Sequence, residues 1–135
     1  MNTPLKDKVE ILPYDPEWPE RFEKLGSDLR DALGNVALRI DHIGSTAILD
    51  LASKPIIDIQ ISVAAFDPAD AYQVPLEKLD YVLQSDNGDR SKRYFREAPG
   101  TRRTHIHVKR AGSWSEQSAL LFRDYLRCHK DHASA

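Results

Sequence analysis

The sequence predicts an α/β or α+β domain in which one mixed β-sheet is flanked by helices. Segments with helical spacing of apolar residues alternate along the chain with segments whose apolar residues recur at every second position. An Asn-Gly pair lies between two strand-like segments late in the chain, which predicts an antiparallel hairpin in the same sheet. We expect a single domain, 1–135, because one hydrophobic core usually serves ~100–200 residues.

Composition and charge exclude several classes of protein. Apolar residues make up 41% of the chain and charged residues 30%, which is typical of folded globular proteins and not of disordered chains. The net charge of -2 argues against generic nucleic-acid binding, which requires a strongly basic balance. No apolar run approaches the ~18–20 residues that span a bilayer, and the N-terminus is too polar for a signal peptide. We expect a cytoplasmic protein with no membrane partner.

The first third of the chain predicts a short strand and a long helix. An apolar segment before Pro13 forms the strand candidate. Asp15 then supplies an N-cap, and Pro16 occupies the first helical position, where its missing N–H costs nothing. Gly34 supplies the C-terminal stop. The helix is predicted by an apolar stripe of Trp18, Phe22, Leu25, Leu29 and Leu33.

Two alternating segments, residues 36–43 and 55–63, predict half-buried strands. In the second strand Asp58 and Gln60 lie on the face opposite the aliphatic side chains. A second helix is expected after the capping pair Asp67-Pro68. The apolar faces consist of Val36, Leu38 and Ile40 in the first strand and Ile57, Ile59, Ile61 and Val63 in the second.

The last third predicts a hairpin, a strand and a helix. The hairpin turns at residues 86–89, and the strand, 102–110, places Thr104, Ile106 and Val108 opposite its two histidines. Ser113 and Glu116 form a capping box for the helix. In that helix one side carries Leu121, Tyr125 and Cys128 and another carries Arg123, Arg127 and Lys130, and we expect Cys128, the single cysteine, to serve in packing.

Residues with chemical potential concentrate between His42 and Gln60. Gly44 permits a tight turn and close approach of a ligand, Ser45 adds a hydroxyl, and the following N–H groups favour an anion. Asp58 and Gln60, two positions apart, share one face of the next strand. A phosphate and a divalent cation could be held together there, since Mg²⁺ takes carboxylate, phosphate and water oxygens. The alternative is a purely structural turn, which also produces this spacing by chance.

Five motifs in order along nearly the whole chain give the sequence a family resemblance. They are Tyr-Asp-Pro-x-Trp-Pro, His-Ile-Gly-Ser-Thr, Lys-Pro-Ile-Ile-Asp-Ile, His-x-His and Phe-Arg-Asp-Tyr-Leu-Arg. The chain resembles the GrpB family, a group of small bacterial proteins of the nucleotidyltransferase-fold superfamily, and the C-terminal domain of some dephospho-CoA kinases. The resemblance implies a nucleotidyltransferase-like fold. Because that family usually continues for another helix, we expect this chain to lack a C-terminal helix.

The resemblance also implies roles for individual residues. Asp58 would bind Mg²⁺, and Gln60 stands where the superfamily places a second catalytic carboxylate. The third carboxylate, on a neighbouring strand, is replaced by His105 and His107. Two-metal transfer depends on negative ligands, so these replacements should weaken or abolish it. The expected nucleotide-binding residues are Gly44, Ser45, Thr46, Lys54, Arg93 and Arg123.

The histidines allow a different metal centre. His105 and His107 share a strand face and, beside Asp58, would form a two-His-one-carboxylate set of the kind that binds Fe, Mn or Zn. The alternative is that both are merely polar residues of a half-exposed strand. His42 precedes the Gly-Ser turn and is expected either to orient the loop or titrate against a bound phosphate, or to serve as a hydrogen-bonded structural histidine.

Three hypotheses follow from the sequence. The leading one is Mg²⁺-dependent binding of a nucleotide or another phosphorylated small molecule, with transfer of a nucleotidyl group to an acceptor. The second is a catalytically degenerate interaction domain with a protein partner, favoured by Gln60 and the missing third carboxylate. The third is a metalloenzyme built on histidine and aspartate with a transition metal. None of the sequence motifs predicts whether the protein turns over any substrate.

Overall fold

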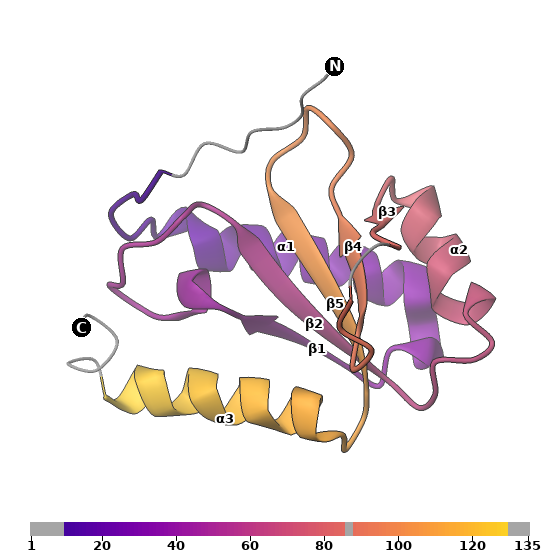
Figure 1. The fold of residues 1–135 in the computed structure, drawn as a ribbon. Coiled ribbons are helices and arrows are strands. Elements are labelled where there is room, and N and C mark those ends of the chain that lie inside the picture. The colour runs from indigo at the N-terminus through magenta and orange to yellow at the C-terminus, as the bar shows by residue number, and fades with distance from the viewer. Residues whose placement is uncertain (1–9, 86–87, 130–135) are drawn as a thin grey trace.

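The computed structural model describes residues 10–85 and 88–129, which form one mixed sheet with helices on both faces. Its order is β1-β2-β5-β4-β3 (Figure 1), in which the central pair β2 and β5 is parallel and the other pairs are antiparallel. The elements are α1 (Glu17–Leu33), η1 (Gly34–Val36), β1 (Arg39–Ile43), η2 (Ser45–Ala47), β2 (Ile57–Val63), α2 (Asp70–Lys78), β3 (Val82–Leu83), β4 (Arg93–Arg96), β5 (Thr104–Arg110) and α3 (Trp114–Cys128). The predicted α+β class is confirmed.

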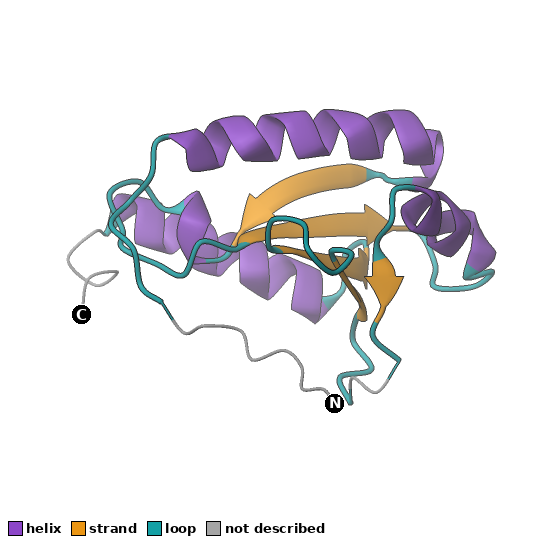
Figure 2. Cartoon of the chain, turned by 90° about the horizontal axis from the view of Figure 1, so that it is seen from above, coloured by secondary structure: helices purple, strands orange, loops and turns teal. Residues whose placement is uncertain are grey.

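The helices divide between the two faces of the sheet. α1 and α2 pack on one face, and α3 lies along the other (Figures 1 and 2). We call the first the core face and the second the α3 face. No helix in the described ranges is both long and apolar enough to cross a membrane.

The long N-terminal helix forms as its sequence predicts. The Asp15 carboxylate accepts the Glu17 N–H at 2.8 Å, which satisfies one of the free donors at the helix start. At the other end the Gly34 N–H donates to the Arg30 carbonyl, with φ at 54°. Trp18 and Leu29 are fully or almost fully buried against the sheet. The predicted stripe therefore faces the core.

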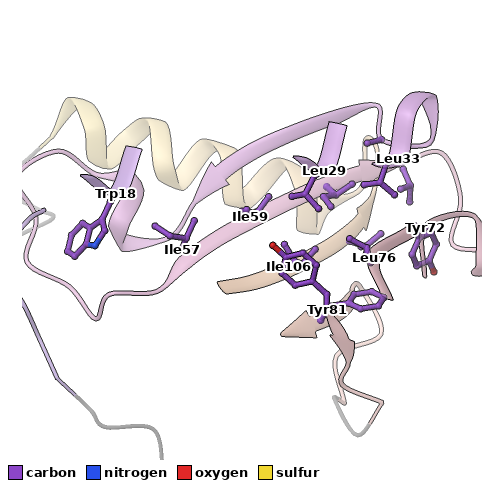
Figure 3. Close-up of a cluster of buried hydrophobic side chains, with 14 residues drawn as sticks. Trp18, Leu29, Leu33, Ile57, Ile59, Tyr72, Leu76, Tyr81 and Ile106 are labelled. Carbon is purple, nitrogen blue, oxygen red and sulfur yellow. The ribbon is translucent and has the colours of Figure 1, made fainter. Parts of the chain in front are cut away.

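The core face consists of aliphatic side chains from the central strands (Figure 3). Ile57, Ile59 and Ile61 of β2 have no exposed area, and neither does Ile106 of β5. The cluster extends from Trp18 at one end to Tyr72 and Leu76 of α2 at the other (Figure 3). The alternation predicted for these two strands is confirmed.

Two predicted strand starts are wrong. Leu38 is 55% exposed instead of core-facing, because the 3₁₀ turn at Gly34–Val36 delays β1 to Arg39. In the segment before Pro13 the described residues form only an isolated bridge, in which Leu12 exchanges two 2.9 Å backbone hydrogen bonds with Ser53. Proline follows each bridge partner within two residues, at Pro13 and Pro55, and the missing N–H groups prevent a longer ladder.

The later elements match the prediction with two exceptions. β3 and β4 form the expected antiparallel pair, but the predicted turn residues Asp86 and Asn87 lie outside the described ranges. The Ser113 side chain accepts the Glu116 N–H and caps α3 as predicted. Cys128, expected in packing, is exposed at the end of this helix.

The inward face of α3 combines polar side chains with a single buried leucine. Glu116 and Leu120 are its buried residues, whereas Leu121 and Phe122 are 62% and 66% exposed. Arg127, on the inward side, donates to the carbonyl of Ala47 at 3.0 Å. Hydrophobic spacing alone therefore does not identify the face that packs on the sheet.

Candidate functional site

The turn after β1 brings the backbone against the carboxylate of Asp58. Gly44 has φ 77° and ψ -176°, a conformation available essentially only to glycine. A Cβ atom at this position would lie 2.6 Å from Asp58 Oδ2. Glycine is therefore required twice, for the turn and for the close approach of the carboxylate.

His42 anchors this turn from the core face. The Thr46 hydroxyl donates to the Ile56 carbonyl at 2.9 Å and accepts from His42 Nε2 at 2.9 Å. His42 also stacks on Phe22, with ring centroids 4.9 Å apart. Burial, with smaller contributions from Arg127 and Arg123, lowers the pKa of His42 to about 4, so the ring is neutral at pH 7. These contacts fit a loop-orienting histidine and a structural histidine alike, and a ring that is neutral at pH 7 offers a phosphate no charge.

The expectation that Thr46 binds the nucleotide does not fit this arrangement. Its side chain is almost completely buried, at 1% exposure, and both of its hydroxyl contacts are internal. Thr46 connects the turn to the segment before β2. The sequence motif predicted the position of the turn, but not which of its hydroxyls faces solvent.

Asp58, His105 and His107 come together on the α3 face, where we call them the Asp58 cluster. His107 Nε2 lies 3.0 Å and His105 Nδ1 3.5 Å from Asp58 Oδ1. Each residue offers one potential metal-ligand atom, and these three atoms all lie within 4.8 Å of one another. The parallel register explains this, because it places Asp58 beside His105 and Gln60 beside His107. The predicted proximity of the HxH strand to Asp58 is thus present.

The outer nitrogens of both imidazoles face cations. Lys92 Nζ lies 3.1 Å from His107 Nδ1, and Arg103 Nη2 lies 3.2 Å from His105 Nε2. Ammonium and guanidinium groups only donate hydrogen bonds, so both outer nitrogens are acceptors. In a neutral imidazole the other nitrogen then carries the hydrogen, and here that hydrogen points toward Asp58.

This pattern of donors and acceptors is the reverse of the one at a transition-metal site. A metal-bound histidine presents a lone pair to the metal and donates its other N–H to a carboxylate or carbonyl. In the Asp58 cluster the inner nitrogens donate and the outer ones accept from Lys92 and Arg103. Metal binding would require both tautomers to change and would leave two cations facing N–H groups. The residues are close enough for a metal, but their surroundings do not fit one.

The cluster holds Asp58 ionised. Burial by itself raises the pKa of this carboxyl, but hydrogen bonds from His105 and His107 outweigh it and lower the pKa to about 2. Burial also lowers the pKa of His107 in spite of the adjacent carboxylate. At neutral pH the cluster is therefore an ionised carboxylate that accepts an N–H group from the neutral ring of His107.

A cavity of about 330 Å³ opens beside the turn, and we call it the Ser45 cavity. Ser45, Lys54 and Asp58 line it, so a hydroxyl, an ammonium and a carboxylate meet at one opening. Ile11 and Ile56 add apolar surface. Of the residues predicted from the sequence, Gly44, Ser45 and Lys54 are the ones that the fold places next to the Asp58 cluster.

Gln60, predicted as catalytic, does not reach the Ser45 cavity. It has no exposed area, and its side-chain nitrogen lies 3.3 Å from the Glu116 carbonyl of α3. Asp41 pairs with Gln60 across β1 and β2, but its carboxylate is bound by Arg39 at 2.8 Å. α3 thus encloses Gln60, whereas Asp58, on the same strand face, lines the Ser45 cavity.

Two predicted phosphate-binding arginines also lie elsewhere. The Arg93 guanidinium stacks on the ring of Phe66 at 4.0 Å, on the core face. Arg123 donates to the His42 carbonyl at 3.3 Å and lies 3.5 Å from Asp41 Oδ1, so it fastens α3 to β1. Neither side chain lines the Ser45 cavity.

The sequence interpretation did not single out the residues that surround the imidazoles. Lys92 and Arg103 were two of many basic residues, and Tyr94, whose ring stacks on His107 at 5.2 Å, received no role. The signal was the alternation of β4, which places Tyr94 opposite His107 once the register is known. That register depends on a hairpin turn whose length the sequence did not predict.

Comparison with known proteins gives a consistent family signal. The sequence model described as "GrpB protein" matches residues 8–135. The UPF0157 protein YqkA of Bacillus subtilis is 36% identical over 128 residues, covering 95% of this chain and 37% of YqkA. PA4798 of Pseudomonas aeruginosa is 38% identical over 130 residues, covering 94% of this chain and 53% of that protein. The chain thus spans about a third to a half of the length of these relatives.

Two further comparisons concern a longer enzyme and solved structures. A dephospho-CoA kinase of Mycobacterium tuberculosis is 34% identical over 141 residues, covering 86% of this chain and 35% of the kinase. The crystal structure of GrpB from Enterococcus faecalis has a TM-score of 0.84 and 34% identity, covering 92% of this chain and 76% of that one. Cid1 poly(U) polymerase with Mg 3'-dATP bound has a TM-score of 0.58 at 14% identity, covering 87% and 38%. The predicted nucleotidyltransferase-like fold is confirmed.

Proposed function

This chain belongs to the GrpB family, and we propose that it binds a nucleotide or another phosphorylated small molecule in the Ser45 cavity. The observation that carries the proposal is the meeting of Ser45, Lys54 and Asp58 at one opening beside the Gly44 turn. A phosphate there can accept hydrogen bonds from the Ser45 hydroxyl and the Lys54 ammonium. The volume, about 330 Å³, is at the lower end of ordinary ligand pockets.

A single Mg²⁺ fits this proposal, and a pair does not. Mg²⁺ is commonly held by one or two carboxylates together with substrate phosphates and water. Asp58, with its pKa near 2, would supply the one carboxylate. Two-metal transfer needs further negative ligands, but Gln60 is neutral and enclosed by α3. Mg²⁺ would therefore help to neutralise the ligand's phosphates, and we propose binding in preference to nucleotidyl transfer.

Calorimetric titration with each of ATP, GTP, CTP and UTP, with MgCl₂ and with EDTA, tests the proposal. We expect at least one nucleotide to bind more tightly with Mg²⁺. Lys54→Ala should weaken binding about tenfold, since a charged hydrogen bond contributes roughly 1.5–3 kcal/mol. Asp58→Asn should remove the Mg²⁺ dependence.

Lys24→Ala is the matched control, because this lysine is 81% exposed on α1 and does not line the Ser45 cavity. Its affinity for nucleotide should equal that of the unsubstituted protein. The proposal would be contradicted if none of the four nucleotides bound. It would also be contradicted if both Lys54→Ala and Asp58→Asn bound nucleotide with Mg²⁺ as tightly as the unsubstituted protein does.

A second candidate is a non-catalytic interaction domain. The burial of Gln60 favours it, as does the similarity to one part of a longer dephospho-CoA kinase. In that case the titrations give no binding, and a stoichiometric protein partner is recovered equally by the unsubstituted chain and by Asp58→Asn. Recovery that depends on Asp58 would point back to the Ser45 cavity.

A further inference from the structure

A second and larger cavity lies on the core side of the sheet. Its volume is about 580 Å³, within the range of small-molecule sites. It lies between α1, the segment after α2 and the connection from β4 to β5. Leu25, Leu79 and Tyr81 supply apolar lining, and Tyr81 borders the core cluster (Figure 3). We call it the Arg21 cavity, and it shares no lining residue with the Ser45 cavity.

Two arginines converge on the Arg21 cavity without a bound counter-ion. Arg21 is half-buried on α1, and Arg102, an exposed residue of the β4–β5 connection, lines the cavity from the other side. Neither guanidinium forms an ion pair or a side-chain hydrogen bond within residues 10–85 and 88–129. Burial, together with repulsion from Arg102, lowers the pKa of Arg21. Two like charges that face one cavity are stabilised by an anion between them.

The hydroxyl of Tyr81 adds a neutral donor. Tyr81 is 8% exposed and lines the cavity, and its hydroxyl makes no hydrogen bond within the described part of the chain. Burial raises its pKa to about 12, so the group stays protonated and can donate. The hydroxyl oxygen is not one of the fully buried atoms that lack a partner, so it is open to the cavity and has room for a partner there. A ligand oxygen in the cavity would provide one.

The carboxylates around the cavity limit the charge of the ligand. Glu97 is bound by Arg96 at 3.0 Å and accepts the Thr104 N–H at 3.0 Å, and it is thus neutralised within the fold. Glu17, Glu20, Asp28 and Asp80 also line the cavity, and Lys24, a further lining residue, lies 3.9 Å from Asp28. The negative charge of these carboxylates disfavours a dianion such as a phosphate monoester more than a monoanion. A carboxylate on an apolar body therefore fits best.

We propose that the Arg21 cavity binds a small organic carboxylate, whose anionic group lies between Arg21 and Arg102 and whose apolar part packs on Leu25, Leu79 and Tyr81. The planar forks of the two guanidinium groups match a carboxylate. This site is independent of the proposed nucleotide site, which lies on the other face of the sheet.

Titration of the ¹⁵N-labelled chain with benzoate, monitored by ¹H–¹⁵N correlation spectra, tests the proposal. Benzoate should shift signals around Leu25 and Tyr81 with an affinity of roughly millimolar strength, as expected for a fragment of this size. Benzamide, its neutral counterpart, should bind at least about tenfold more weakly, and so should phenyl phosphate. Arg21→Gln and Arg102→Gln should each weaken benzoate about tenfold.

Arg90→Gln is the matched control, since Arg90 is exposed and does not line the cavity. It should bind benzoate as the unsubstituted chain does. Shifts that are absent from the cavity, equal binding of benzamide, or undiminished binding in both folded arginine variants would overturn the proposal. Tighter binding of phenyl phosphate than of benzoate would overturn the assignment to carboxylates.

Discussion

The two faces of the sheet come from the same strands but bury different chemistry. On the core face β2 presents Ile57 and Ile59 to α1 and α2, and this apolar packing requires no specific hydrogen-bond partner. On the α3 face the same strand presents Asp58 and Gln60, each held by named hydrogen bonds. The first arrangement supplies free energy by removing apolar area from water. The second fixes the positions of polar side chains through hydrogen bonds. Substitutions on the two faces should therefore reduce stability for different reasons.

The largest effect is expected on the core face. Ile59→Ala should lower the free energy of unfolding by about 3.5 kcal/mol, because it removes buried methyl groups and leaves a cavity in a close-packed region. Urea unfolding followed by circular dichroism measures the change. Leu38→Ala is the control, since Leu38 is 55% exposed, and it should cost less than about 1 kcal/mol. Equal losses in the two variants would show that the core lies elsewhere.

Acidification should reduce the stability contributed by the two faces in different pH ranges. The folded chain lowers the pKa of His42 from 6.5 to about 4. Between these values the unfolded chain binds a proton that the folded one excludes, so stability falls as the pH falls, by about 3 kcal/mol. The pKa of Asp58 is lowered from 3.8 to about 2. Its contribution is present above pH 3.8 and is lost between pH 3.8 and 2, by about 2 kcal/mol.

Urea unfolding at half-unit pH steps distinguishes the two windows. His42→Gln should flatten the dependence between pH 6.5 and 4 and leave the lower window. Asp58→Asn should remove the lower window and steepen the upper one, because the Asp58 carboxylate raises the pKa of His107. In His42→Gln the free energy of unfolding should still fall slightly between pH 6.5 and 4, because the pKa of His107 is also lowered. A wild-type-like slope in both variants would disprove these assignments.

A smaller effect is expected where the two faces meet, at the Gly44 turn. Gly44→Ala should lower the free energy of unfolding by about 2 kcal/mol, from the glycine-only backbone conformation and the contact with Asp58. Gly100→Ala is the control, because Gly100 has φ +89° and nothing within 4 Å of an added Cβ. It should cost only the backbone part.

The double variant Gly44→Ala/Asp58→Ala isolates the contact. If the carboxylate is pressed against the turn, the two losses should be less than additive in a thermodynamic cycle. Additive losses would mean that the turn and the carboxylate are energetically independent. The measurement therefore reports whether the α3 face is under tighter geometric control than the core face.

Local patterns in the sequence predicted more of the core face than of the α3 face. Alternation in β2 and β5 identified Ile59 and Ile106 as core residues because burial in a strand repeats every second position. The same alternation correctly grouped Asp58 with Gln60. It could not show that α3 covers Gln60, because the inward side of that helix carries Glu116 and arginines in place of an apolar stripe.

The surroundings of the imidazoles depend on contacts that no local pattern encodes. His105 and His107 were recognised as a pair from their spacing, but Lys92 reaches His107 across a hairpin. Arg103 reaches His105 from only two residues away, just before β5 begins at Thr104, where no strand alternation predicts the direction of its side chain. Thr46 and Arg93 were misjudged for a related reason, since their motif positions were right while their side chains point inward or to Phe66.

The parallel pairing of β2 with β5 has a consequence for biosynthesis. Asp58 and His107 are separated by 49 residues in sequence, and their strands are joined through the centre of the sheet. Such a non-local pairing forms slowly, because a long loop must close before the contacts can stabilise it. During translation, the Gly44 turn and Asp58 leave the ribosome well before the strand that carries the imidazoles. The nascent chain therefore holds an unpartnered carboxylate until β5 emerges, and no short segment can carry the Asp58 cluster to another scaffold.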